Sequence, residues 1–257
     1  MNQEQDPAAM QITPPFGYGP VAPLLKSHRV RLMQQVPPAL ASSNAIPLTM
    51  AEIPRAGRDY PVVFASSDGG ASFSVLGVLG LAEGENLFIG EDGKWDNAAY
   101  QPAYLRRHPF CMAVVHQDGQ QQEERVVCVE EAALDASQGL MTERPDGSAL
   151  SWWSERLHLL QEYEADMLRT RQMCDWVARL GLLESFSAQA VIDGGEVLNL
   201  GGMFRISEER LGRLNADTLR ALIDKGVMGR LYAHMLSLDR LASLLDRRQL
   251  RAGSARQ

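Results

Sequence analysis

The middle of the chain alternates short apolar runs with turn residues. Runs enriched in valine and isoleucine lie on both sides of the Asp-Gly pairs at Asp68, Asp118 and Asp193. Such runs favour strands, and Asp-Gly tolerates the positive φ angles of tight hairpin turns. No helical pattern separates the runs, as a parallel sheet would require. The pattern therefore predicts consecutive antiparallel hairpins.

Two later regions have the spacing of helices instead. In residues 148–184 the large apolar residues recur every three or four positions, and Gly181 is the expected end of the helix. Near the C-terminus, Ser207 is a good N-cap residue, and a leucine-rich stripe follows between Leu231 and Leu245. We therefore expect an α+β fold with a hairpin-rich antiparallel sheet core, a long helix and a C-terminal helical layer.

The ends of the chain differ in composition from the rest. Residues 1–25 hold five of the 13 prolines, which predicts a flexible, Pro-rich arm. Residues 26–250 are expected to form a single α+β domain. Residues 251–257 are expected to be a disordered tail.

Composition and charge narrow the possible partners. The 257 residues are 45% hydrophobic and carry a net charge of −7, with no long basic stripe. This balance favours a folded, soluble protein and argues against nucleic-acid binding. No apolar run reaches 18 residues, so we expect no membrane span. The N-terminus lacks the features of a signal peptide, which makes the cytoplasm the expected compartment and leaves surface association by another route open.

The three cysteines, Cys111, Cys128 and Cys174, have no C-x-x-C spacing. Their odd number and spacing predict neither a disulfide framework nor a cysteine zinc site. Cys111 and Cys128 lie in strand-like runs, so we interpret them as small buried apolar residues.

The motifs of common enzyme classes are absent from the sequence, including G-x-S-x-G, Walker A and H-E-x-x-H. One alternative is enzymatic. His116 and Asp118 form an H-x-D pair that a later histidine, His158 or His234, could complete as a facial triad for Fe(II). Arg240 would then bind a 2-oxoacid cosubstrate. The simpler interpretation is that Asp118 begins a turn and His234 lies in a leucine-striped helix, with no catalytic residues, metal or cofactor.

Residues 84–110 combine aromatic and arginine side chains, which are the types that dominate binding hot spots. We predict a protein-binding surface here, formed by Trp95, Tyr104, Arg106, Arg107 and His108. The alternative is that the aromatics pack under a long loop and the arginines tie that loop to carboxylates.

The same block carries a family resemblance. "NLFIGEDGKW", "PAYLRRHPF" and the later "GGMFRISEERLGRL" and "YAHMLSL" resemble the bacterial SapC family over residues 45–246. The resemblance implies a role near envelope structures, the surface layer or TonB-dependent uptake, and it supplies no catalytic residues. We therefore expect a non-catalytic accessory protein that binds a protein partner. The alternatives are an Fe(II)- and 2-oxoacid-dependent oxygenase and a small-molecule-binding sensor.

Overall fold

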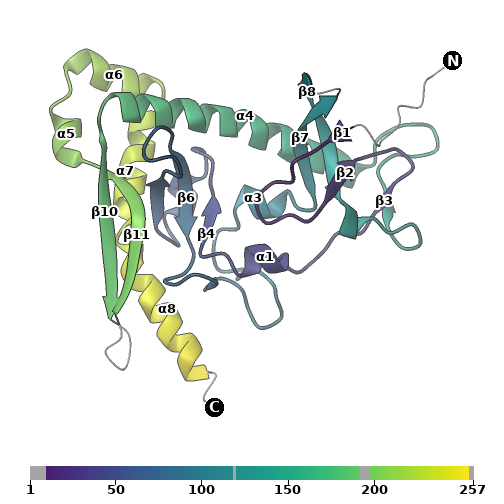
Figure 1. Ribbon diagram of the computed structural model, residues 1–257, viewed down its shortest axis with the longest axis horizontal. Helices are drawn as coiled ribbons and strands as arrows, with labels where there is room; N and C mark the ends of the chain where they lie inside the picture. The colour runs from purple at the N-terminus through teal and green to yellow at the C-terminus, as the bar shows by residue number, and fades with distance from the viewer. Residues whose placement is uncertain (1–9, 118–119, 192–196, 255–257) are drawn as a thin grey trace. The chain divides into compact units, whose positions relative to one another are not determined.

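The computed structural model describes residues 10–117, 120–191 and 197–254, in which helices and antiparallel sheets are mixed (Figure 1). This confirms the predicted α+β class. The chain divides into two compact units. The first comprises Met1–Ala39 and Arg107–Glu164, and the second comprises Leu40–Arg106 and Ala165–Gln257. A single domain over residues 26–250 stays a prediction.

The described part of the first unit contains a four-stranded antiparallel sheet in the order β1-β7-β8-β2 and a two-stranded sheet, β3-β9. The strands are β1 (Met10–Gln11), β2 (Val21–Pro23), β3 (Arg29–Val30), β7 (Phe110–Gln117), β8 (Gln120–Glu130) and β9 (Leu140–Met141). A short 3₁₀ turn, Glu131–Ala133, follows β8. The predicted hairpin around Asp118 is confirmed by the pairing of β7 with β8, although residues 118–119 lie outside the described residues.

Two of these strands come from the segment predicted to be a flexible arm. Met10 pairs with Gln117 of β7, and Val21 pairs with Glu130 of β8. Residues 10–11 and 21–23 therefore form the two edge strands of the sheet, so the segment is not a free arm over its whole length. Residues 1–9 lie outside the described part of the chain.

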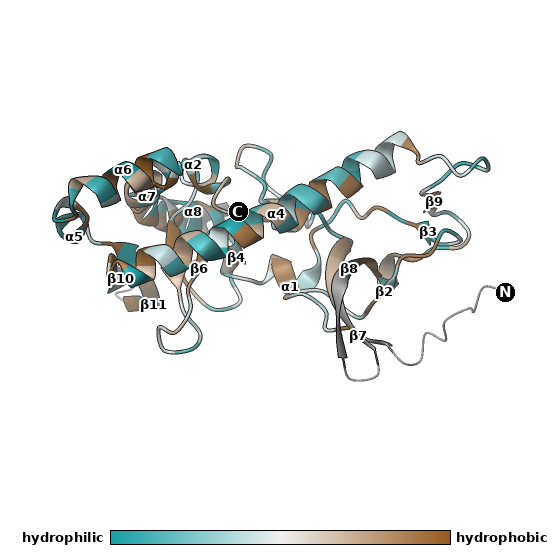
Figure 2. Cartoon of the chain, turned by 90° about the horizontal axis from the view of Figure 1, so that it is seen from above, coloured by the Kyte–Doolittle hydropathy of each residue, from teal (hydrophilic) through white to brown (hydrophobic). Residues whose placement is uncertain are grey.

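Aromatic residues fill the core of the first unit. The long helix α4 (Ser151–Arg179) was predicted from its spacing, and its first turns carry Trp152 and Trp153. The Trp153 ring lies 5.0 Å from that of Phe110, which is fully buried in β7. Val129 and Leu160 complete the same apolar cluster. Figure 2 shows hydrophilic and hydrophobic residues alternating along α4, as expected of a helix with a buried stripe.

The described second unit contains a five-stranded antiparallel sheet in the order β10-β11-β5-β6-β4. Its strands are β4 (Ala45–Pro47), β5 (Val62–Ala65), β6 (Ser74–Val78), β10 (Leu183–Val191) and β11 (Val197–Ile206). The β5–β6 and β10–β11 pairings confirm two further predicted hairpins. Gly69 has a φ of 71°, as the Asp68-Gly69 turn requires, whereas the turn at Asp193 lies outside the described residues.

Four helices confirm the expected C-terminal helices within the described residues: α5 (Glu208–Gly212), α6 (Ala216–Asp224), α7 (Val227–Ser237) and α8 (Arg240–Ser254). Three short helices lie earlier in the chain: α1 (Pro38–Ala41), α2 (Ile53–Ala56) and α3 (Ala103–Arg106). Asn215 caps α6 by accepting a 2.8 Å hydrogen bond from the backbone N–H of Thr218. Gly226, with a φ of 67°, links α6 to α7.

Helix α8 includes residues 251–254, so the chain is helical further than the predicted tail allowed, and residues 255–257 lie outside the described part. Among the described residues, no helix combines the length and the apolar character needed to cross a membrane.

Candidate functional site

Two residues of the predicted binding block lie in the core of the second unit. The indole of Trp95 is 6% exposed, stacks 5.6 Å from the Phe88 ring, and donates a 3.1 Å hydrogen bond to the Ala99 carbonyl. Tyr104, in α3, is 4% exposed. These contacts favour the interpretation that the aromatics pack beneath a long loop.

Arg106 and Arg107 have different environments despite being adjacent. Arg106 is partly exposed, and its guanidinium donates to the Tyr100 hydroxyl at 3.2 Å. Arg107 is 4% exposed and lies 4.5 Å from the centroid of the Tyr163 ring. Its Nη1 is 3.6 Å from the Glu164 carboxylate. Arg107 therefore serves as a buried cation held by an aromatic face and a carboxylate.

His108 also has a partner inside the first unit. Its Nε2 lies 2.5 Å from an oxygen of Glu130, whose other oxygen accepts a 2.6 Å hydrogen bond from the Gly19 backbone. Burial lowers the pKa of His108, against the opposing effect of the nearby Glu130. Of the five predicted residues, only Arg106 keeps substantial exposure within the structure described. Partner binding by this block stays a prediction.

The residues of the alternative iron site are not seen together. Asp118 and the side chain of His116 lie outside the described residues, while His158 is exposed on α4. His234 is fully buried, and both of its ring nitrogens bond backbone groups, the oxygen of Val62 and the N–H of Ile206. The described residues hold no cluster of three metal-ligating side chains. The iron site and its Fe(II) cofactor stay untested predictions.

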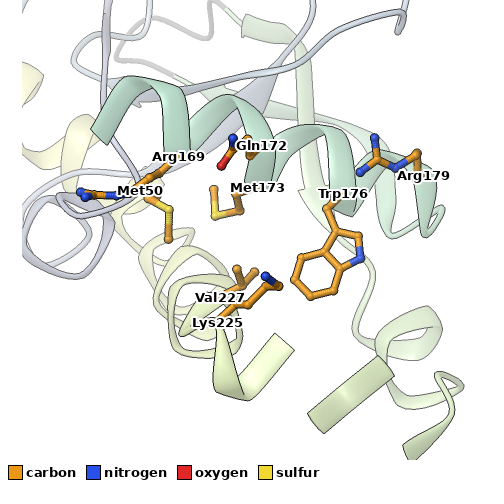
Figure 3. Close-up of a pocket in the computed structure, with 8 residues that line it drawn as sticks. All are labelled: Met50, Arg169, Gln172, Met173, Trp176, Arg179, Lys225 and Val227. Atoms are coloured by element: carbon orange, nitrogen blue, oxygen red, sulfur yellow. The ribbon is translucent and has the colours of Figure 1, made fainter. Parts of the chain in front are cut away.

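A pocket of about 560 Å³ in the second unit has the features of a binding site. One wall is a single face of α4, because its lining residues are three or four positions apart. These residues are Arg169, Gln172, Met173, Trp176 and Arg179. Figure 3 shows Met173 and Trp176 pointing into the space from this helix, with Arg179 beyond Trp176.

The opposite wall comes from the loop before α2 and from the junction of α6 and α7. Met50 is held against α4 by its backbone N–H, which donates a 2.7 Å hydrogen bond to the Thr170 hydroxyl. Lys225 and Val227 flank Gly226, whose positive φ turns the chain between the two helices. In Figure 3 the side chains of Met50, Val227 and Lys225 meet those of α4 around a common space.

The charged residues that line the pocket are all cations. Its eight lining residues include Arg169, Arg179 and Lys225 and no carboxylate. Arg169 is paired with Asp166 at 2.7 Å. Within the described chain, neither Arg179 nor Lys225 forms an ion pair. Arg179 and Lys225 therefore line the pocket as cations that form no ion pair within the described residues.

A second pocket, of about 420 Å³, includes Trp95, and its arginines already have partners within the protein. Its Arg247 is paired with Asp96 at 2.9 Å and lies 4.2 Å from the Phe88 ring centroid. Its Arg251 donates to the carbonyl oxygens of Asn86 and Ile89. These cations are already used to hold the C-terminal helix, so this pocket offers less for a ligand.

Sequence reasoning did not find the pocket at α4. Trp176 is one of the large apolar residues whose spacing predicted the helix, and the sequence did not connect the cations of the pocket with it. The i, i+3, i+4, i+7 spacing of Arg169, Gln172, Met173 and Trp176 was a signal for one wall. Nothing local in the sequence connects that wall to Met50 or Lys225.

Comparison with known proteins gives one family. The SapC family profile matches residues 26–244, which is most of the chain. No curated protein and no solved structure matches the chain. The extent of the profile match shows that the chain belongs to the SapC family.

Proposed function

We propose that the chain is a non-catalytic binding protein and that the pocket at α4 receives an organic carboxylate with an apolar body. The observation that carries the proposal is the charge of this pocket: cations and apolar side chains surround it, and its lining contains no acid. The proposal keeps the expected non-catalytic role, but it places binding at the α4 pocket instead of the predicted block at residues 95–108.

The apolar part of the site suits a ring or a short alkyl chain. Met173 and Val227, on opposite walls, are buried, and Trp176 and Met50 are partly exposed. A volume of about 560 Å³ falls within the usual range for small-molecule pockets. Aromatic and thioether side chains adapt well to flat or irregular apolar groups.

The polar part of the site suits a single negative charge. Arg179 can bind a carboxylate through two N–H groups, and Lys225 adds a point charge. Helix α7 begins at Val227, so the positive end of its dipole also lies at the pocket. A phosphate is a poorer match, because phosphate sites commonly use several backbone N–H groups from a glycine-rich loop.

The family resemblance implies an accessory role near the bacterial envelope. A binding protein that captures an amphipathic acid is compatible with such a role. The envelope link, a protein partner and the expected cytoplasmic location stay predictions beside the pocket proposal.

Isothermal titration calorimetry with a matched pair of probes tests the site. The probes are 1-naphthaleneacetate and its neutral amide, 1-naphthaleneacetamide, which share the ring and differ in charge. We expect the carboxylate to bind about tenfold more tightly than the amide, the effect of one charge-assisted contact.

Variants of the lining residues test whether the preference for the carboxylate probe arises in the pocket. Arg179→Gln combined with Lys225→Gln should remove the preference for the carboxylate, and Trp176→Ala should weaken both probes. Arg213→Gln is the matched control, since Arg213 is exposed on another helix end and pairs with Glu209. Equal affinity for the two probes, or a preference that persists in the double variant, would refute the proposal.

A further inference from the structure

Two cysteines face each other across strands of the first unit. Cys111 of β7 is in direct register with Cys128 of β8, between the pairs Phe110–Val129 and Met112–Val127. Side chains of directly opposed residues point to the same face of a sheet. Both cysteines are fully buried and both are free thiols. The two sulfur atoms therefore share one side of the β7–β8 hairpin.

The backbone hydrogen bonds define the type of this pair. The N–H of Glu130 donates a 2.9 Å hydrogen bond to the carbonyl of Pro109. Hydrogen-bonded pairs alternate with non-bonded pairs along an antiparallel ladder, so Cys111 and Cys128, two positions further, also form a hydrogen-bonded pair. The Cα atoms of such pairs are about 5.5 Å apart. Disulfides span Cα distances of about 4.4 to 6.8 Å, so the expected backbone separation lies in the range of a disulfide. A disulfide also needs Cβ atoms about 3.5 to 4.5 Å apart, so the two residues must lean toward each other to form it.

The surroundings hold the two thiols against each other. They pack with Val21 of β2 and Ala113 of β7 in one apolar cluster. The Cys128 thiol donates a 3.6 Å hydrogen bond to the Val126 carbonyl. The proximity of the two thiols raises the pKa of Cys111 and lowers that of Cys128. The thiolate is the reactive form of cysteine, and both thiols can react with an external disulfide only before folding buries them.

We propose that Cys111 and Cys128 are a redox pair that forms a reversible cross-strand disulfide by exchange with a low-molecular-weight disulfide. The thiolate of one cysteine attacks the disulfide and releases one thiolate, leaving a mixed disulfide on that cysteine. The other cysteine then loses its proton, and its sulfur attacks the protein sulfur of the mixed disulfide and releases the second thiolate. Two protein thiols are oxidised, and one external disulfide is reduced to two thiols.

The pair belongs to the first unit and the carboxylate pocket to the second. The redox proposal therefore stands or fails independently of the proposed function. Cys174 supplies an internal control, because it is buried in the second unit and its pKa is raised to about 12 by burial. Cys174 should therefore take no part in the disulfide.

The test uses the full chain, unfolded under reducing conditions and refolded in a buffer of 2-hydroxyethyl disulfide and 2-mercaptoethanol. Refolding in the buffer allows exchange before the thiols become buried. We expect the mass to fall by that of two hydrogen atoms, with one reactive thiol left after denaturation. Proteolysis without reductant should give a peptide joining Cys111 to Cys128, and dithiothreitol should restore all three thiols.

The variants distinguish this pair from other pairings. Cys174→Ser should still oxidise, whereas Cys111→Ser should leave only mixed disulfides or free thiols. The oxidised protein should also melt at a higher temperature than the reduced protein, because the cross-link restricts the unfolded chain. A folded protein that keeps three free thiols over the whole range of buffer ratios, or a disulfide that includes Cys174, would overturn the proposal.

Discussion

His234 donates a 2.7 Å hydrogen bond from Nδ1 to the backbone oxygen of Val62, joining α7 to β5. Its Nε2 accepts a 3.1 Å hydrogen bond from the N–H of Ile206 at the end of β11. The imidazole thus links a helix to two strands of one sheet, and it does so only in its neutral form. A proton on Nε2 would face another donor.

Burial of His234 makes stability depend on pH. It lowers the pKa of His234 from 6.5 to about 4. As the pH falls below 6.5, the unfolded chain binds a proton that the folded protein excludes, so the free energy of unfolding decreases until the pH reaches about 4. Between pH 7 and pH 5 we expect a loss of about 2 kcal/mol from this residue. Urea unfolding at both pH values measures it.

The matched variant for this prediction is His234→Gln, which cannot titrate. The variant should be less stable at pH 7 and should lose less free energy on going to pH 5 than the wild-type protein does. The same pH dependence in both proteins would assign the effect to other groups.

Glu52 should be required as a carboxylate. It is 4% exposed, and one oxygen accepts from the Ala103 N–H at 2.6 Å and from the Tyr100 hydroxyl at 3.1 Å. The other oxygen accepts two hydrogen bonds from Thr49. Glu52→Gln places an amide donor against these donors, and we expect a loss of about 3 kcal/mol in unfolding free energy. Glu208→Gln, on the exposed start of α5, should change it by less than about 0.5 kcal/mol.

Gly80 should not tolerate a side chain. A Cβ atom there would lie 2.1 Å from the backbone oxygen of Glu85, so the loop would have to move. Gly80→Ala should destabilise the protein by about 2 kcal/mol or more. At Gly201, in β11, a Cβ atom meets nothing within 4 Å, and Gly201→Ala should be neutral or slightly stabilising. Thermal unfolding compares the stability of the two variants, and an equal change in melting temperature would contradict the prediction.

Arg107 and Arg106 should respond differently to truncation. Arg107→Ala removes a buried cation that pairs with the Glu164 carboxylate, so we expect a loss of about 3 kcal/mol. Arg106→Ala should cost less than about 1 kcal/mol, since Arg106 is partly exposed. Urea unfolding of the two variants measures this difference. Charge reversal at Arg106 alone is therefore the suitable test of partner binding by the predicted block.

Local pattern in the sequence was sufficient for the hairpins and the long helix, but it missed β1 and β2 in the proline-rich segment. Asp68-Gly69 marked a hairpin because only a few residue types accept a positive φ, and the apolar spacing of residues 151–179 marked α4 because helical geometry repeats every 3.6 residues. The α+β class followed from those elements. The family was also visible in the sequence, through motifs such as "PAYLRRHPF".

Tertiary structure alone decided which side chains are exposed for binding and which distant side chains meet. Trp95 and Arg107 have the residue types of a binding surface, yet packing buries both. The pocket at α4 needs Met50 and Lys225, which lie far apart in the chain and meet only after the second unit folds. The facing of Cys111 and Cys128 depends on strand register, where a shift of one residue would separate them. Burial and register arise from contacts between distant segments, and the local spacing of residues does not contain them.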